Sequence, residues 1–269
     1  MRIAVGIEYD GSSWRGWQFQ GHDTRTVQHA LQQALARVAA HDLSLIAAGR
    51  TDAGVHASAM VAHFDSESPR SMRAWVQGCN SHLPASIALR WAQPVADDFH
   101  ARFSAVARRY RYVIYNDALR SALWRDQVTW HHRPLDVDRM REAAASFCGE
   151  QDFTSVRAAA CQAHHARRCV HFLEVWRQGP LVILDIEANG FLHHMVRNIA
   201  GILLAVGDGR RPPQWAAEVL AARDRTQAAV TAPPAGLYFV RVRYPQRFIL
   251  PELPLGPHFI LPAVLAPRA

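Results

Sequence analysis

Apolar and polar residues alternate at the start of the chain, where Ile3, Val5, Ile7 and Tyr9 fall on one side of residues 2–9. This period of two is typical of a strand with one buried face. After Thr26 the apolar residues recur at helical spacing, and Thr26 is placed to cap the first turn of a helix. Further apolar runs predict strands at 43–48, 59–64 and 87–95 and a helix that begins after Ser71. The predicted order is β-α-β-β-α-β.

The second half of the chain repeats this order of elements. Its patterns predict a strand at 108–116, a helix beginning at Asp136 or Val137, a hairpin within 169–188 that turns at 178–180, helices at 193–207 and 212–222, and a strand at 236–245. The order is again β-α-β-β-α-β, with an extra helix and a loop-rich insertion. The halves share no evident sequence identity, so the repeat rests on the order of elements alone. From this order we expect an α+β protein of two ferredoxin-like halves with antiparallel sheets, at residues 1–104 and 105–246.

The connection between the two middle strands differs between the halves. In the second half it is a tight turn, whereas in the first half it is the sequence GRTDAGVH at 49–56. Gly49 and Gly54 permit close approach of a ligand, and Asp52 is a lone carboxylate that Arg50 would keep ionised, as a nucleophile or general base must be. Alternatively, TDAG is a turn in which Asp52 bonds its own backbone. The sequence pattern leaves both interpretations open.

The charge of the chain favours a polyanionic partner. Its 269 residues include 30 Lys plus Arg against 23 Asp plus Glu, a net charge of +7 and a pI near 9.8, and arginine supplies most of the positive charge. The planar guanidinium pairs with phosphates and stacks on bases, which indicates nucleic acid. High genomic GC content would produce the same arginine bias.

Residues 97–115 mix basic and aromatic side chains, a combination that suits phosphates and stacked bases together. An amphipathic strand with its aromatic residues in the core, such as Tyr112, and its arginines in solvent would look the same.

Several classes of protein and site are disfavoured. No apolar run approaches the length of a membrane-spanning helix, and Glu8 and Asp10 interrupt the only candidate for a signal peptide, so a cytoplasmic protein is expected. The four cysteines lack zinc-site spacing, and the three His-His doublets lie next to no paired carboxylates, so no metal is expected. Repeated prolines in 247–269 predict an irregular tail.

Taken together, the motifs GRTDAGVHA, DDFHARFSA followed by ARRYRY, DFTS, HHMVRN, and DRTQAA followed by GLYF resemble the tRNA pseudouridine synthase A family over essentially the whole chain. The resemblance implies two ferredoxin-like halves with their sheets side by side and the active site in the cleft between them. It also implies a homodimer that converts uridine to pseudouridine at positions 38, 39 and 40 of the tRNA anticodon stem-loop, without cofactor or metal.

The resemblance assigns roles to particular residues. Asp52 is the expected nucleophile, Arg50 contacts the tRNA, and Tyr110 stacks on the target base. Arg197 is expected to pair with Asp52, and Leu237 to line the uracil pocket. The expected contacts with the RNA backbone are Phe99, His100, Ala101, Arg102 and Phe103, with Arg102 helping to hold the flipped nucleotide.

The implied reaction suits these residue types. The N1–C1′ bond must break, the uracil must rotate, and C5 must join C1′, so the nucleotide has to leave the stacked helix. The Asp52 carboxylate would attack C1′ or C6 or act as a base at C2′, and these alternatives stay open. The proton on C5 must then leave, and the Tyr110 hydroxyl is a candidate base.

The sequence departs from the family pattern at two places. Residues 160–168 lack the Ser/Thr-Arg segment of the family, and Ala118 replaces a basic residue of some relatives, which puts individual RNA contacts in doubt.

Two other functions would suit parts of the sequence. A non-catalytic RNA-binding module of RRM type would share the element order, but its K/R-G-F/Y-G/A-F-V-x-F/Y strand is absent from the sequence. A metal-dependent phosphoesterase would need a carboxylate cluster that the sequence lacks.

Overall fold

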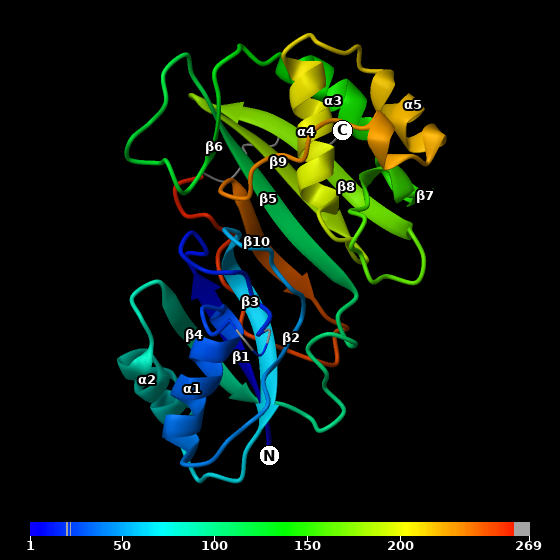
Figure 1. Ribbon diagram of the computed structural model, residues 1–269. Helices are drawn as coiled ribbons and strands as arrows, with labels where there is room; N and C mark the ends of the chain where they lie inside the picture. The colour runs from blue at the N-terminus through cyan, green and yellow to red at the C-terminus, as the bar shows by residue number, and fades with distance from the viewer. Residues whose placement is uncertain (20, 22, 261–269) are drawn as a thin grey trace. The chain divides into compact units, whose positions relative to one another are not determined.

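The computed structural model describes residues 1–19, 21 and 23–260 and divides the backbone into two compact units (Figure 1). Unit 1 contains Met1–Arg108 and Tyr238–Pro254, and unit 2 contains Arg109–Leu237 and the residues from Leu255 onward. Both are mixed α/β, with mostly antiparallel strands. Together, their described residues form five α-helices. The last strand belongs almost wholly to unit 1, whereas the boundaries expected at 104 and 246 would place it in the second half.

Unit 1 contains the predicted β-α-β-β-α-β order. Its elements are β1 (Arg2–Tyr9), α1 (Val27–Ala39), β2 (Ile46–Ala47), β3 (His56–Asp65), α2 (Met72–His82) and β4 (Ile87–Pro94), joined by β10 (Leu237–Arg243). β1 lies between β4 and β3, antiparallel to both. On the other edge of β3, β2 pairs along 62–63 and β10 pairs in parallel along 56–57. The helices α1 and α2 lie side by side (Figure 1).

The helix caps of unit 1 follow from the sequence. The Thr26 hydroxyl accepts from the backbone N–H of His29 at 3.4 Å, as the pattern predicts. The Ser71 hydroxyl accepts from the backbone N–H of Ala74 at 3.1 Å and caps the second helix in the same way. Both helices start where expected. β2 is only two residues long rather than the expected six, because the chain before Ile46 is irregular.

The prediction of one buried face on β1 is wrong for residues 3–7, which are buried on both faces. The reason is Trp91 of β4, whose ring lies over Gly6 on the face expected to be open. A Cβ on Gly6 would come within 2.1 Å of the Trp91 Nε1 atom. Glycine is therefore required here by close packing, and alternation alone could not show it.

Unit 2 is built on four neighbouring strands in the order β5-β9-β8-β7. Its elements are β5 (Ala107–Asn116), β6 (Thr129–His131), α3 (Val137–Ala145), β7 (Gly149–Asp152), β8 (Arg167–Gln178), β9 (Leu181–Ala188), α4 (Met195–Gly207) and α5 (Trp215–Ala222), with the 3-10 turns η1 (Thr154–Val156) and η2 (Arg225–Gln227). The β8–β9 hairpin turns through Gly179 at φ 55°, where a turn was predicted. The helix α3 begins at Val137, as predicted, and the Asp136 side chain caps it.

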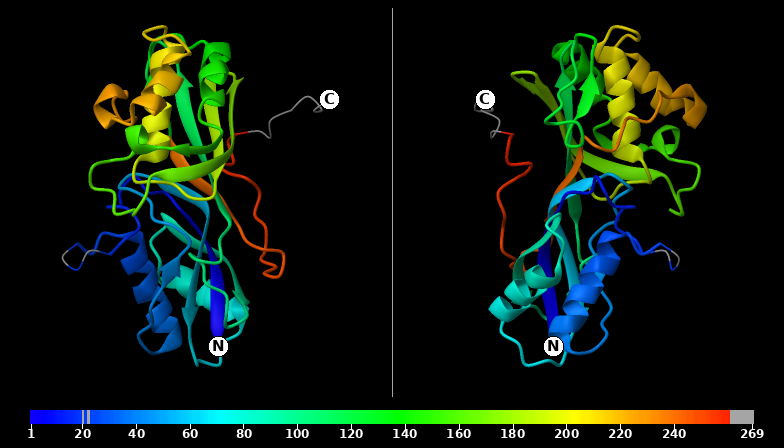
Figure 2. Two further views of the ribbon diagram at one scale, coloured as in Figure 1. Left: turned by 90° about the vertical axis from the view of Figure 1, so that its right-hand side faces the viewer. Right: turned by 60° about the vertical axis from the view of Figure 1, so that its left-hand side comes forward.

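Two short strands of unit 2 were not predicted. β6 pairs in parallel with β5, and β7 pairs antiparallel with β8 at the edge of the sheet. Each is three or four residues long, too short for an apolar period to appear. The helices α3 and α4 lie on one side of the long strands, and the described part of the tail from Leu255 runs along the other (Figure 2). Residues 247–260 form neither helix nor strand, as expected for the tail, and 261–269 lie outside the described residues. The strand predicted at 236–245 ends earlier, at Arg243.

A buried carboxylate ties β9 to β5 within unit 2. Asp185 is 1% exposed and accepts from Arg109 Nε at 2.6 Å, from Arg109 Nη2 at 2.8 Å and from Arg111 Nε at 2.8 Å. Arg111 Nη1 donates in turn to the Gly256 carbonyl at 3.0 Å. The same ion cluster therefore fixes two strands and the tail.

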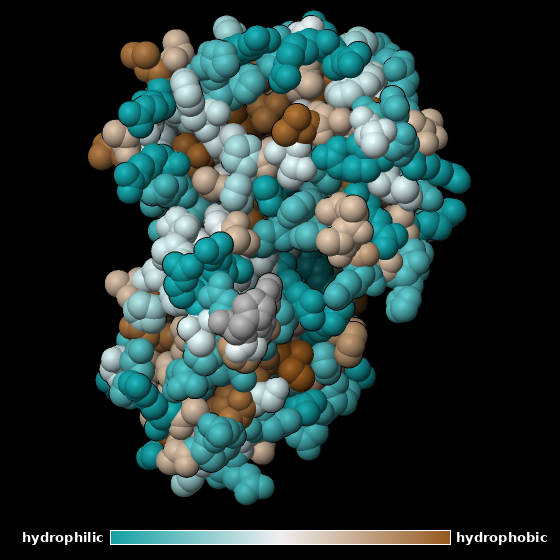
Figure 3. Space-filling model, viewed as in Figure 1, coloured by the Kyte–Doolittle hydropathy of each residue, from teal (hydrophilic) through white to brown (hydrophobic). Residues whose placement is uncertain are grey.

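The surface is largely hydrophilic on the face drawn in Figure 3, where hydrophobic atoms appear in separate small groups. None of the helices described is long and apolar enough to span a membrane.

Candidate active site

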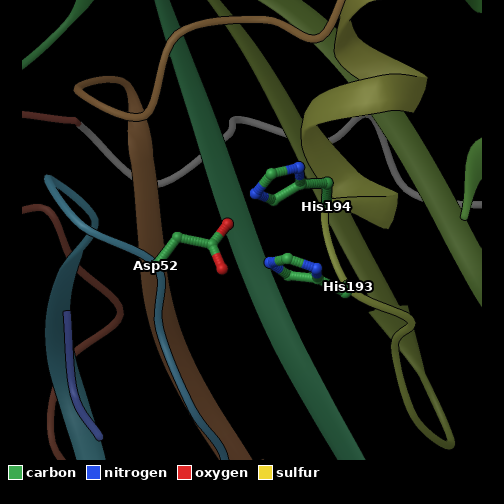
Figure 4. Close-up of side chains that lie close together, drawn as sticks. All are labelled: Asp52, His193 and His194. Atoms are coloured by element: carbon green, nitrogen blue, oxygen red, sulfur yellow. The ribbon is translucent and has the colours of Figure 1, made fainter. Parts of the chain in front are cut away.

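Asp52 lies in the loop between β2 and β3, and the main chain holds this loop (Figure 4). The N–H of Val55 donates to the Asp52 carbonyl at 3.2 Å and closes the turn. Residues before and after Asp52 are also tied to the segment that follows β1: Trp17 N–H donates to the Thr51 carbonyl at 3.0 Å, and Gly54 N–H donates to the Trp14 carbonyl at 3.3 Å. The half-buried Asp52 side chain is therefore not needed to close the turn.

The glycines that matter most to this loop lie outside it. A Cβ on Gly11 would stand 1.9 Å from the Val55 carbonyl oxygen, and Gly16, at φ +88°, would place one 2.6 Å from the Thr51 carbonyl oxygen. These two positions let the segment after β1 lie directly against the loop. The sequence suggested that Gly49 leaves space for a ligand, and the structure does not support this. A Cβ on Gly49 would lie 3.3 Å from the Phe239 ring, so the ring occupies that space.

The expected RNA-contacting stretch, residues 99–103, forms a loop after β4. Phe99 and Ala101 are fully buried, and Phe99 packs against Tyr244 and Phe248. Arg102 and Phe103 are exposed, and the Arg102 guanidinium lies 5.5 Å from the centre of the Phe103 ring. The side chains that reach the surface are therefore Arg102, Phe103 and the partly exposed His100, which stacks on Phe103 at 4.3 Å.

Two histidines hold this loop by accepting backbone hydrogen bonds. His100 Nδ1 accepts from Arg102 and Phe103 at 3.2 and 3.1 Å, and His63 Nδ1 accepts from Ala101 at 3.2 Å. Burial, then the nearby His100 and Arg2, lowers the pKa of His63 to about 4. Burial likewise lowers the pKa of His100. Both rings are therefore neutral near pH 7, and their lone pairs remain available as acceptors.

Arg108 brings the two candidate loops of unit 1 together. Its Nη2 atom donates to the Ala48 carbonyl at 3.1 Å, at the start of the Asp52 loop, and to the Arg102 carbonyl at 2.5 Å. Its Nη1 atom donates to the Ala105 carbonyl at 3.0 Å. The basic-aromatic stretch suggested phosphate contacts for such residues, so this structural role of Arg108 was missed.

Tyr110 and Leu237 lie in unit 2. Tyr110 is a buried residue of β5, and its ring meets Phe191 edge to face at 5.0 Å. Leu237 is 5% exposed at the start of β10, and its N–H donates to the Pro234 carbonyl at 2.9 Å. Both are placed by backbone pairing rather than by flexible loops.

Arg197 lies in the first turn of α4, as the HHMVRN motif predicted. The helix begins after His194, which has the left-handed angle φ 62°, and its first turn holds no acidic residue (Figure 4). Arg197 Nε donates to the Ala232 carbonyl at 2.8 Å, and Ala232 N–H donates back to the Arg197 carbonyl at 3.1 Å. The guanidinium and the positive helix end together suit an anionic group.

Comparisons with known proteins agree with the motifs. A model of the family described as tRNA pseudouridine synthase matches residues 6–104 and 143–245. The tRNA pseudouridine synthase A of Alcanivorax borkumensis is 57% identical over 256 residues, 95% of this chain and 96% of that protein. That of Pseudomonas aeruginosa is 56% identical over 259 residues, 96% of this chain and 91% of that protein.

A more distant likeness is found among solved structures. The chain is similar to one titled "Structure of H/ACA RNP bound to a substrate RNA containing 2'-deoxyuridine", with a TM-score of 0.38 and 11% identity over 75% of this chain and 44% of that chain. The family of this protein rests on the family model and on the curated relatives, which share more than half of their residues with it.

Proposed function

Because the chain belongs to the tRNA pseudouridine synthase A family, whose members are isomerases that convert uridine to pseudouridine, we propose that it acts on uridines 38, 39 and 40 of the tRNA anticodon stem-loop. The observation that carries the assignment of chemistry is the Asp52 loop. Its backbone is fixed by hydrogen bonds on both sides of Asp52, while the Asp52 side chain stays partly exposed. A reacting group needs this combination of fixed position and access.

Asp52 acts on a uridine that has been flipped out of the helix. The carboxylate serves as nucleophile at C1′ or C6, or as base at C2′, and the N1–C1′ bond breaks. After C5 has joined C1′, the proton on C5 leaves to a base, for which the Tyr110 hydroxyl is our candidate. Tyr110 also stacks on the uracil, Leu237 lines its pocket, and Arg197 pairs with Asp52.

The surface side chains of two loops bind the RNA. Arg50 of the Asp52 loop and Arg102 are exposed cations for phosphates. Phe103 and His100 present an aromatic stack beside Arg102. Phe99 and Ala101 contribute by holding the loop from inside. We take residues 1–104 and 105–246 as the two ferredoxin-like halves, and the active protein as a cytoplasmic homodimer that needs no cofactor or metal.

The proposal is tested by tritium release from tRNA transcribed with [5-³H]uridine, since only replacement of the C5 hydrogen frees tritium. The purified protein is expected to release it, and carbodiimide treatment followed by primer extension should then mark positions 38–40. Modification outside the anticodon arm would contradict the substrate site. Absence of tritium release on every tRNA tested would contradict the reaction.

Replacing Arg50 or Arg102 by alanine should weaken tRNA binding and flatten its salt dependence. A phosphate contact releases counterions, so losing one lowers the slope of log affinity against log salt by about 1. The measurement is filter binding across salt concentrations. Arg73→Ala, which removes an exposed arginine on α2, is the matched control and should leave the slope unchanged. An unchanged slope in either loop variant would exclude that arginine as a phosphate contact.

A further inference from the structure

His56 is the first residue of β3 and stands four positions after Asp52 in the GRTDAGVH loop. It is 2% exposed. Gly11 N–H donates to His56 Nδ1 at 3.1 Å, and an Asp10 carboxylate oxygen lies 3.1 Å from the same atom. The Tyr238 ring stacks on the imidazole with centroids 4.7 Å apart and planes 19° apart. All of these groups belong to unit 1.

The segment that His56 contacts is the one that holds the Asp52 loop. Residues 10–17 reach the loop through the bonds of Trp14 and Trp17 and through the close approach of Gly11 to the Val55 carbonyl. Tyr9, just before this segment, shares a hydrogen bond of 2.8 Å with the Thr51 hydroxyl. A shift of Gly11 would therefore move the backbone on which Asp52 stands.

The two contacts at Nδ1 require opposite proton states. The Gly11 N–H needs a lone pair on Nδ1, whereas a hydrogen bond to the Asp10 carboxylate needs a proton there. One ring nitrogen cannot meet both conditions at once. Its protonation state therefore decides whether His56 holds the backbone at Gly11 or the side chain of Asp10.

We propose that His56 is a positioning residue for Asp52: with Nδ1 unprotonated it holds Gly11 and keeps residues 10–17 against the Asp52 loop, and with Nδ1 protonated it binds Asp10 and releases Gly11. The inference rests on the proposed function, which makes Asp52 the reacting carboxylate. In this role His56 acts only through the loop and does not touch the substrate.

The titratable groups against the ring fit this exchange. Asp10 approaches from the segment after β1, and its hydrogen bond with His56 holds the pKa of Asp10 well below its usual range, against the opposing effect of burial. Tyr238 approaches from β10, and burial together with the nearby Asp10 raises the pKa of Tyr238, which stays a neutral phenol. Asp10 is thus an anion ready to bind a protonated ring.

The test compares two amides at position 56 in the full-length protein. His56→Asn places its amide oxygen where Nδ1 lies, because both are bonded to Cγ, whereas His56→Gln places the amide near the Nε2 position. In steady-state tritium release we expect the kcat of His56→Asn to stay within about 3-fold of wild type. His56→Gln should lose roughly 10- to 100-fold in kcat with KM for tRNA unchanged, because small misplacements of a reacting group are costly. Equal rates for the two variants, or a loss confined to KM, would overturn the proposal.

A second variant separates the two contacts at Nδ1. Asp10→Asn removes the carboxylate but keeps an acceptor for the Ser12 N–H, so His56 keeps Gly11 and kcat should stay within about 3-fold of wild type. A loss in Asp10→Asn as large as the one expected for His56→Gln would overturn the proposal, even if His56→Gln fails to fold. Wild type without activity would instead contradict the proposed function, whereas active wild type, inactive Asp52→Asn and fully active His56→Gln would contradict this inference alone.

Discussion

Replacing Asp52 by asparagine is expected to reduce tritium release by at least about 10³-fold, the scale on which removal of a nucleophile acts. The amide has nearly the same shape, but it lacks the charged oxygen needed to attack the sugar or the base or to remove a proton. The loop itself should persist, because main-chain hydrogen bonds from Trp17, Gly54 and Val55 hold it and none of them uses the Asp52 side chain. Binding of tRNA and the melting temperature should therefore stay close to wild type.

The matched control for this variant is Asp42→Asn, which makes the same change at an exposed position of unit 1 before β2. It should react at the wild-type rate. If Asp52→Asn, folded and still binding tRNA, releases tritium as fast as Asp42→Asn does, Asp52 is not the reacting carboxylate. A loss of binding without a loss of single-turnover rate would instead make Asp52 an RNA contact.

Local signals in the sequence predicted most of the regular elements. Thr26 caps the helix that it was expected to cap, and the helices expected after Ser71 and at Asp136 or Val137 begin there. The β8–β9 hairpin turns at Gly179. These features depend on neighbours within a few residues, so their chemistry is visible in a short window. The long connection between β2 and β3 was visible for the same reason, and it carries the Asp52 loop.

Features that depend on distant residues could not be predicted. Gly11 is fixed by Val55, and Gly6 by Trp91, so their need for glycine comes from chain segments more than 40 residues away. The basic-aromatic pattern of 97–115 likewise did not reveal that Phe99 is buried while Phe103 is 76% exposed. Alternation assigns a side chain to a face only where the backbone is a regular strand, and residues 98–104 form a loop.

Histidine side chains that accept hydrogen bonds connect the candidate loops to the framework of unit 1. His56, His63 and His100 each accept backbone N–H groups through Nδ1, from Gly11, from Ala101, and from Arg102 and Phe103. A histidine side chain reaches farther than Asp or Asn and accepts without carrying charge at neutral pH. The sequence pattern disfavoured the His-His doublets as metal ligands, and it did not reveal the backbone hydrogen bonds that these three single histidines accept.

The largest effect on stability is expected from Asp185→Ala. This change leaves the guanidinium of Arg111, which is 5% exposed in its side chain, and that of Arg109 without their shared carboxylate. Removing one partner of a buried ion pair costs about 3–5 kcal/mol, because the remaining charge stays buried and uncompensated. For a chain of this size the melting temperature should fall by roughly 10 °C.

Thermal unfolding followed by circular dichroism measures this loss, and Glu150→Ala is the control. Glu150 pairs with Arg167 at 3.3 Å, but both side chains are about two-thirds exposed, so its loss should cost less than about 1 kcal/mol. Replacing all three members of the buried cluster by apolar residues, as in Arg109→Met, Arg111→Met and Asp185→Leu together, should restore part of the stability, since no charge is then left buried. If Asp185→Ala has the same melting temperature as Glu150→Ala, the cluster contributes nothing to stability. If the triple variant has a lower melting temperature than Asp185→Ala, the loss comes from packing rather than from unpaired charge.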